Sequence, residues 1–490
     1  MRNRIILNSL LLLLTAAPCS ALEFQPVGSL GIGGAGVART TNAYAGYWNP
    51  AGLAFSETAF SSRLNIGAGV RINSTMAENV DKIGKLDIEE LDDININASG
   101  LTPALITQNR EFAGKAVQFV GILDNLSKED GNLTVNADAI LAFQYRRFAI
   151  GGFSTAELAA VPRTETTAIR FGGTTTMNDF ALGIGSLNAV RGGTQLLGDY
   201  YGQVVTAFGG GQQAEEIVST LEAELVRSNP TSMTSEQARD ALILMGNALR
   251  NQAPSLEDNQ SKLEYTGIIL IDFPISYGHQ IDLGSFGKLG VGGSLKVIQA
   301  RTFIGESQIV KLEDSGDIVE EITDHYKDST GFGVDLGALW RYGDWLSVGI
   351  VGKNLNSPSF DTPVIAGIAT RSIKVKPQVR TGVAVEPFSW LTLAADLDLT
   401  ENDTILVGRK SRNFGGGLEL HPFTWLKFRA GAYENLADGD VGIVGTAGLT
   451  IGTKWLSLDI DGAASPETGK FEDSKYPKEA RIQTSLNIQF

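Results

Sequence analysis

Six residues near the N-terminus, Gly31-Ile32-Gly33-Gly34-Ala35-Gly36, have the spacing G-x-G-x-x-G that binds dinucleotide phosphates. That fingerprint requires a buried strand before the glycines, a helix after them and an acidic residue about 20 positions further on. Here segment 23–27 is short and polar, only Glu57 lies near the acidic position, and Pro50 would break the helix. The context therefore argues against a nucleotide site, and the glycines need another explanation.

Other catalytic or metal-binding patterns are missing from the sequence. The three histidines, His279, His325 and His421, are far apart, which disfavours a metal cluster or a Ser-His-Asp triad. No nucleophile-elbow, zinc-protease or phosphate-loop motif is present. The acid-rich stretch 313–328 is expected to be solvated loop, with calcium as the alternative. We therefore expect neither enzymatic activity nor a cofactor.

The first 21 residues have the pattern of a secretory signal: Arg2 and Arg4, a mainly apolar run, and Cys19-Ser20-Ala21. The run is too short for a membrane-spanning helix. Cys19 would suit lipoprotein processing, but Pro18 is unfavourable directly before a lipidated cysteine. Cleavage after Ala21 leaves a mature chain without cysteine, so it has no disulfide or thiolate chemistry. The net charge of −15 argues against nucleic acid as a partner.

Much of the rest of the chain alternates apolar and polar residues with the period of a β-strand. In segment 391–399 the odd positions are apolar and the even ones small or acidic, so Asp396 and Asp398 share one face. Segment 482–490 repeats the alternation. A soluble sandwich alternates too. The segments, however, are as long as tilted membrane strands and are joined alternately by short turns and long loops, which is typical of an outer-membrane barrel. The two carboxylates would then face a wet lumen.

We predict a transmembrane antiparallel β-barrel of about 14 strands. The expected strands lie near 58–73, 132–145, 147–157, 263–278, 287–300, 330–341, 345–355, 376–386, 390–400, 411–420, 424–433, 441–452, 455–464 and 479–490. An even count suits a closed bacterial barrel, and a further hairpin within 165–192 would raise it to sixteen.

Four Trp-Leu pairs, beginning at Trp345, Trp390, Trp425 and Trp455, each follow a tight turn. With both barrel termini in the periplasm, these turns are periplasmic and segments 74–131, 158–262 and 301–329 lie outside the cell. The tryptophans could form an aromatic girdle, or could cap turns and close the lower lumen.

The two longest insertions, 74–131 and 158–262, contain helical patterns. Segments 215–227 and 235–250 each have one apolar stripe, and 104–126 is a weaker helical candidate. These helices either pack on one another or provide a surface for a lid or a protein partner.

The glycine-rich stretch, followed by Ala45-Gly46-Tyr47-Trp48-Asn49-Pro50-Ala51-Gly52, resembles the start of FadL-like outer-membrane transport proteins, and especially their conjugal-transfer TraF-like branch. The resemblance implies an N-terminal hatch, residues 22–57, inside a barrel of residues 58–490. It assigns Gly31, Gly33, Gly34, Gly36, Asn49, Pro50 and Ala51 to the hatch motif.

The resemblance further implies passage of hydrophobic small molecules, such as long-chain fatty acids, through the outer membrane of a Gram-negative-type bacterium. Partners would be outer-membrane lipid and the hydrophobic compound. The alternative is a structural component of a conjugation or secretion apparatus that binds a protein through its helical insertions. An exported β-sandwich enzyme is a third, weaker possibility. The sequence identifies no ligand-binding residue.

Overall fold

A computed structural model provides the structure of the chain. It describes residues 19–20, 25–73, 103–128, 131–165, 177–184, 195–228, 233–251, 260–308, 325–365, 372–406, 409–471 and 474–490, with positions 76, 78, 79, 82, 83 and 86. No helix in these ranges is long and apolar enough to cross a membrane.

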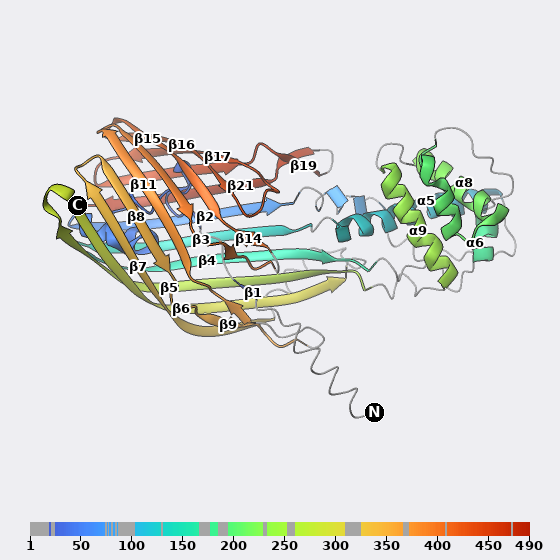
Figure 1. Ribbon diagram of the computed structural model, residues 1–490, viewed down its shortest axis with the longest axis horizontal. Coiled ribbons are helices and arrows are strands. Elements are labelled where there is room, and N and C mark those ends of the chain that lie inside the picture. Colours follow the sequence, from blue (N-terminus) through green and yellow to red (C-terminus); the bar gives the residue numbers. More distant parts are fainter. Residues whose placement is uncertain are drawn as a thin grey trace, which may run out of the picture.

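Fourteen antiparallel strands close into a barrel (Figure 1). In chain order they are β2 (Phe60–Ile72), β3 (Leu133–Tyr145), β4 (Phe148–Arg163), β5 (Lys262–Asp282), β6 (Lys288–Gln308), β7 (Tyr326–Tyr342), β8 (Leu346–Lys353), β11 (Gln378–Phe388), β12 (Leu391–Asp398), β15 (Asn413–Phe423), β16 (Leu426–Asn435), β17 (Val444–Gly452), β18 (Leu456–Ala464) and β21 (Glu479–Gln489). The first strand pairs with the last, Leu64 opposite Leu486, which closes the cylinder.

The strand count and order match the prediction. Strands β5 and β6, with 21 residues each, are longer than expected and extend the wall on one side. The hairpin considered within 165–192 is not part of the barrel: α6 (Met177–Gly183) is helical, and most of the remaining segment lies outside the described residues.

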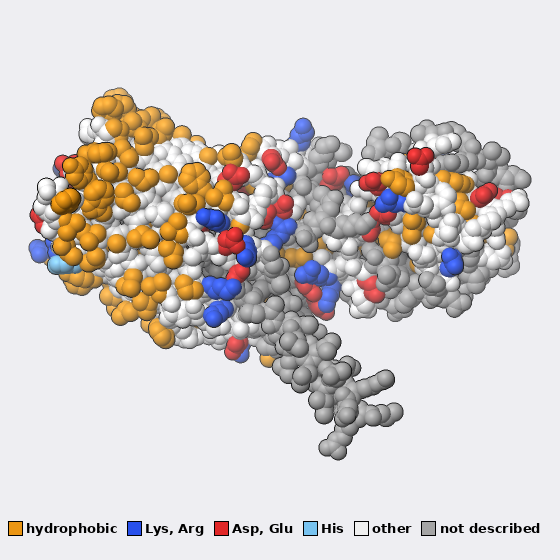
Figure 2. Space-filling model, viewed as in Figure 1, with side chains coloured by type: hydrophobic (Ala, Val, Ile, Leu, Met, Phe, Trp, Pro, Cys, Tyr) orange, Lys and Arg blue, Asp and Glu red, His pale blue; other side chains and the backbone are white. Residues whose placement is uncertain are grey.

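Side chains alternate across the wall with apolar residues outside and polar residues inside. On β21, Ile482 and Leu486 are 60% and 40% exposed, whereas Gln483 and Ser485 between them are at most 3% exposed. Figure 2 shows the resulting apolar surface over the end of the barrel remote from the helices. A closed barrel with an apolar outer band and a polar interior is the architecture of an outer-membrane protein, because lipid faces only the outward residues.

The four tryptophans lie at the rim next to the short turns and are each about half exposed. Trp390 stacks on Phe388 and Trp425 on Phe423, with ring centroids 5.2 and 5.7 Å apart. Because none of the four is buried in the lumen, the arrangement fits an aromatic girdle and not a plug of the lower barrel.

The helices of the two insertions form a separate bundle beyond the strand ends (Figure 1). They are α5 (Pro103–Lys128), α6, η3 (Gly198–Tyr200), α7 (Tyr201–Ala207), α8 (Gly211–Ser228) and α9 (Ser235–Asn251). The expected helices are confirmed, and α5 is the longest of them. The apolar stripes of α5, α8 and α9 pack together around Phe119, Leu221 and Leu242, which are fully buried. The bundle therefore has a hydrophobic core of its own.

The remaining short elements lie in the predicted signal, the hatch and the loops. They are β1 (Cys19–Ser20), η1 (Leu30–Ile32), α2 (Ala45–Trp48), η2 (Pro50–Phe55), η4 (Gly284–Phe286), β9 (Ser359–Asp361), β10 (Ser372–Lys374), β13 (Asn402–Asp403), β14 (Lys410–Ser411), β19 (Thr468–Phe471) and β20 (Ser474–Pro477). β1 pairs with β10, and removal of the predicted signal would delete that pairing.

Candidate functional site

The hatch segment is buried inside the barrel: nearly every residue from Gln25 to Phe55 is buried. Gly33 and Gly34 have φ of +66° and +73°, the left-handed region that favours glycine. They turn the chain after η1, and α2 and η2 follow. The segment that resembles a dinucleotide fingerprint is thus a tight turn inside the lumen, with no strand-loop-helix unit around it.

One part of the hatch, residues 28–39, lies against polar side chains of β11, β12, β15–β18 and β21; we call this contact the polar seat. Asp396 Oδ2 accepts hydrogen bonds from the backbone N–H groups of Gly36 and Val37 at 2.8 and 2.9 Å. Arg380 Nη2 donates to the Gly34 carbonyl at 3.2 Å. A carboxylate and a guanidinium of the wall thus satisfy the hatch backbone, which has no sheet or helix partner there.

This arrangement corrects the expectation that Asp396 and Asp398 are wet lumen carboxylates. Both are only 2% exposed. Asp398 pairs with Arg380 at 3.1 Å and accepts from the Asn413 backbone N–H at 2.8 Å. The hatch fills the space where water would be, so these carboxylates are buried and must be paired.

Further contacts extend the polar seat. Gly28 N–H donates to Gln483 Oε1 at 2.8 Å, and Gly33 N–H donates to Thr446 Oγ1 at 3.2 Å. Arg39, the only charged residue between Gln25 and Phe55, pairs with Glu419 at 2.9 Å. The hatch is therefore fixed to several strands that are distant in sequence.

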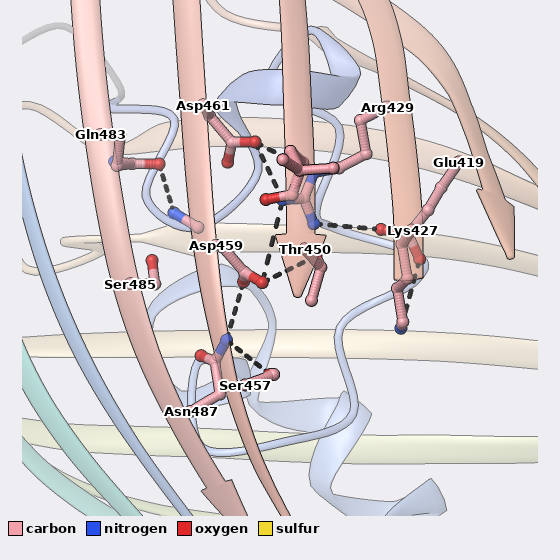
Figure 3. Close-up of polar contacts among 12 residues, drawn as sticks. Glu419, Lys427, Arg429, Thr450, Ser457, Asp459, Asp461, Gln483, Ser485 and Asn487 are labelled. Carbon is pink, nitrogen blue, oxygen red and sulfur yellow. Dashed lines mark hydrogen bonds and ion pairs between the residues drawn. The ribbon is translucent and has the colours of Figure 1, made fainter. Parts of the chain in front are cut away.

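Figure 3 shows the wall side of this seat, where polar side chains of neighbouring strands bond to one another. Arg429 lies between Asp461, at 2.9 Å, and Glu419, at 3.4 Å. Asp459 accepts from Thr450 at 2.7 Å and from Asn487 at 2.8 Å. Charges buried among such partners hold one geometry, because an unpaired member would be costly.

Residues 45–55 of the hatch contact the wall mainly through packing; we call this contact, with β4–β8, the packing seat. Strand glycines face the hatch backbone here. A Cβ atom on Gly292 would lie 2.4 Å from Ala51 N, and one on Gly278 would lie 2.6 Å from Ala54 N. Such distances are far below van der Waals contact, so any larger side chain on these strands would displace η2.

Asn49 is the main polar residue of the packing seat and is fully buried. Its Oδ1 accepts from Ala51 N–H at 3.1 Å and caps η2, while Nδ2 donates to the carbonyls of Val37 at 3.2 Å and Ala338 at 3.1 Å. Pro50 occupies the first position of η2, where its fixed φ is favourable. A Cβ on Gly337 would lie 2.0 Å from Asn49 Oδ1.

The barrel wall is interrupted beside the packing seat. The β4–β5 ladder pairs Ile150 with Ile275 and Phe153 with Asp272, but skips Gly151 and Gly152. Opposite them stand Phe273 and Pro274, and proline has no N–H to donate. The missing pairs leave a gap in the hydrogen bonding of the wall, in addition to the register shifts near the turns of β11–β12 and β15–β16.

The hatch covers this gap from inside. The ring of Tyr47 packs edge-on against Phe153, with centroids 5.7 Å apart. Lys353 Nζ lies 3.8 Å from the centroid of the same ring, and the Tyr47 hydroxyl donates to the Gln25 carbonyl at 3.0 Å. Burial raises the pKa of the Tyr47 hydroxyl, so it remains a neutral donor.

On the side of the gap that faces the helices, the inner wall becomes apolar. A buried cluster joins inward residues of β4–β6 to the loops that fold over them: Ala159, Ile268, Leu270, Ile298, Ala300, Phe360, Ile373, Val375 and Ile405. Between this cluster and the gap, Lys296 Nζ lies 2.9 Å from Asp272 and 3.2 Å from Asp335. A packed apolar cluster and a neutralised ion cluster therefore follow one another along the same strands.

The structure brings together all seven residues of the predicted hatch motif, but in two groups. Gly31, Gly33, Gly34 and Gly36 belong to the polar seat; Asn49, Pro50 and Ala51 belong to the packing seat. Sequence reasoning missed their partners Arg380, Gly337 and Phe153, and misjudged Asp396. A charge on the inward face of a barrel strand was the available signal, but the sequence does not show what lies opposite.

The three histidines remain apart. His279 is on the outer face of β5, within 3.4 Å of the Tyr277 hydroxyl; His325 precedes β7; His421, on β15, lies 2.5 Å from Glu419. Most of the acid-rich stretch 313–328 lies outside the described residues. Its last residue, Asp328, binds Arg301 through two hydrogen bonds of 2.7 and 2.8 Å.

Comparison with known proteins gives one family match. The family model described as "F plasmid transfer operon, TraF, protein" matches residues 46–398, more than half of the chain. A search of curated proteins finds no match.

Several solved structures are similar over nearly their whole length. The Ralstonia pickettii toluene transporter TbuX is 12% identical, with 95% of this chain and 98% of that chain covered and a TM-score of 0.45. The Pseudomonas putida toluene transporter TodX is 11% identical, with 96% of this chain and 99% of that chain covered and a TM-score of 0.43. A Pseudomonas aeruginosa FadL homologue is 11% identical, with 97% of this chain and 99% of that chain covered and a TM-score of 0.41.

Proposed function

The chain belongs to the family of the F plasmid transfer operon TraF protein, as residues 31–54 led us to expect, and from the geometry of its hatch and wall we propose that it passes hydrophobic small molecules through the outer membrane. The route is non-catalytic and gated by the hatch. Molecules pass between the apolar residues clustered inside β4–β6 and leave sideways into the membrane between β4 and β5.

The observation that supports this proposal most directly is the β4–β5 gap at Gly151 and Gly152. A hydrophobic molecule gains nothing by crossing a polar lumen into water, but it gains about 25 cal/mol per Å² of apolar surface by entering lipid. An opening in the wall is therefore the natural exit. Tyr47 and Phe153, in contact at this point, are the side chains that must separate.

The polar remainder of the lumen supports the same direction of exit. A route straight through to the periplasm would break the buried ion pairs of Figure 3 and the Asp396 bonds to the hatch. A sideways route leaves them intact and requires movement only at the packing seat. The substrate class proposed is long-chain fatty acids or similarly apolar compounds.

A disulfide across the gap tests the proposal. Removal of the predicted signal leaves no cysteine, so Gly152→Cys with Phe273→Cys introduces one isolated pair. The two positions continue the register in which Ile150 faces Ile275. The matched control is Ala156→Cys with Ile269→Cys, a pair on the same strands where the ladder is continuous.

We expect oxidation of the gap pair to lower uptake of a long-chain fatty acid into proteoliposomes at least ten-fold, and reductant to restore it. The control pair should transport equally in both states. Unchanged uptake through the oxidised gap pair would refute the lateral exit. Transport of toluene in place of the fatty acid would change the substrate but retain the route.

The alternative is attachment of a protein partner, and the helical bundle is the observation that favours it. Its hydrophobic core around Phe119, Leu221 and Leu242 contains residues of the insertions only. The bundle therefore has the organisation of a small domain. Replacement of 166–259 by a short linker would separate the two functions. A transporter retains uptake in this variant, whereas an assembly component loses its partner and never shows uptake.

A further inference from the structure

The deeper of two small cavities beside the polar seat is lined by positive charge. It has a volume of about 30 Å³ and is bounded by the hatch residues Pro26, Gly33, Gly34 and Trp48 and by wall residues Arg71, Arg380, Asn413, Tyr433 and Arg481. Among the described residues that line it, three carry guanidinium groups and none carries a carboxylate. The site lies on strands other than β4 and β5 and is thus separate from the proposed lateral route.

The carboxylates that neutralise these arginines lie outside the cavity lining. Glu479 accepts from both Arg71 Nε at 2.7 Å and Arg481 Nε at 2.9 Å, so one carboxylate serves two guanidinium groups. Arg380 is paired with Asp398 at 3.1 Å and with Asp396 at 3.4 Å. Because the guanidinium groups line the cavity and these carboxylates do not, the charges nearest to a small ion there are positive.

The volume limits what the cavity can hold. About 10–15 Å³ is the minimum for one water molecule, so the site has room for one water or one ion of similar size and not for an acyl chain. Guanidinium N–H groups donate to anions at short range, and arginines lining a narrow polar passage select anions in membrane pores. The polar Asn413 and Tyr433 complete a lining suited to an ion that stays partly hydrated.

A second cavity adjoins the first on the side of the loop between β16 and β17. It has a volume of about 20 Å³ and shares Arg71, Asn413 and Tyr433 with the first. Its other lining residues include Arg409, Asp438 and Asp440, which lie at the outer ends of the strands. One layer of shared side chains thus separates the deeper cavity from the outer mouth.

We propose that the deeper cavity binds one small inorganic anion, of the chloride type, and that the bound anion holds the hatch in place. An anion there bridges arginines of β2, β11 and β21, and one of these, Arg380, donates to the hatch carbonyl of Gly34. Loss of the anion removes this bridge between the three strands and weakens the polar seat.

Protease access to the hatch measures the effect. Trypsin cleaves after Arg39 when the hatch opens, and the rate follows the open population. At ten times the dissociation constant, bromide or chloride should slow this cleavage about ten-fold relative to gluconate at equal ionic strength, because gluconate is too large to enter. Arg481→Gln should lose the difference between the anions, whereas Arg481→Lys should keep most of it.

The matched control is Lys427→Gln, which removes a half-exposed lumen cation that does not line the cavity. It should respond to bromide like the unaltered protein. A bromide anomalous peak at the three arginines in crystals of the unaltered protein gives a readout that does not depend on folding of a variant. Equal protection by bromide and gluconate, or protection by octanoate alone, would overturn the assignment, the latter in favour of a carboxylate head group.

Discussion

The hatch meets the barrel through two seats that rely on different forces. The polar seat holds residues 28–39 by hydrogen bonds and ion pairs, of which the Asp396 bonds to Gly36 and Val37 are central. The packing seat holds residues 45–55 by close contact between backbone and strand glycines such as Gly292 and Gly337. The first is directional and buried, and the second depends on the absence of side chains.

The difference indicates which part of the hatch can move. Opening the polar seat exposes or unpairs buried charges, which is costly in a low dielectric. Opening the packing seat costs van der Waals contact and the bonds of one amide, Asn49. The wall gap adjoins the packing seat, so the mobile side of the hatch and the weak side of the barrel coincide. Four substitutions test this contrast, in order of decreasing expected effect.

Gly337→Val should displace the hatch altogether, because its Cβ would lie 2.0 Å from Asn49 Oδ1. Overpacking costs about 1–3 kcal/mol, and more where the displaced group is itself held in place, as the Asn49 side chain is by its hydrogen bonds. Trypsin cleavage after Arg39, in a barrel that still shows heat-modifiable gel mobility, measures the displacement. The control is Gly462→Val, whose nearest neighbour atom would be 3.9 Å away. If trypsin cleaves the hatch no faster in Gly337→Val than in the control, close packing against the strand glycines does not hold the hatch in place.

Asp396→Ala should lower the free energy of unfolding by about 3–5 kcal/mol, since it removes one partner of a buried ion pair and two hydrogen bonds to the hatch. Asp396→Asn retains an acceptor and should lose less. Urea unfolding in phospholipid vesicles provides the measurement. A loss below about 1 kcal/mol, the range of exposed ion pairs, would show that the carboxylate is wet after all.

Asn49→Ala should lower the free energy of unfolding by about 2 kcal/mol. The loss combines the missing helix cap at Ala51 with carbonyls, such as that of Ala338, that no longer have a donor. Asn49→Ser restores a capping oxygen but cannot reach the Ala338 carbonyl, so it separates the two contributions. The same urea titration applies. If both variants also raise the rate of fatty-acid uptake, the packing seat is the side of the hatch that moves. If uptake falls while the hatch stays protected from trypsin, the packing seat is not the moving side.

Arg39→Gln should lower the free energy of unfolding least, by about 0.5–1 kcal/mol. The arginine is partly exposed, and its partner Glu419 still forms an ion pair with Arg429. The cost should shrink in high salt, which screens the partly exposed arginine. Arg39→Lys, with the charge kept, serves as the control. Because Arg39→Gln removes the trypsin site, stability is followed by urea unfolding. A loss of stability as large as that of Asp396→Ala would show that the polar seat depends mainly on the partly exposed Arg39–Glu419 pair.

Most of the barrel follows from the sequence because a strand that faces lipid and lumen must alternate. The pattern at 482–490 predicts β21 with Ile482 outside and Gln483 inside, and the short turns before Trp390 and Trp425 predict the hairpins. Helices α8 and α9 follow from their apolar stripes. These features are local, since the period of each segment reflects its own surroundings.

The seats of the hatch could not be read in the same way. Asp396 and Gly36 are 360 residues apart, and nothing in either segment indicates the other. The gap at Gly151 and Gly152 depends on which residues of β5 stand opposite, which is a matter of register. The alternation of residues along the chain is enough to predict the barrel and its inward and outward faces, and the context of the glycine-rich segment is enough to exclude a nucleotide site. The burial of Asp396 and the approach of Gly337 to Asn49 follow from the folded state instead, because contacts between distant segments exist only once the hatch fills the lumen.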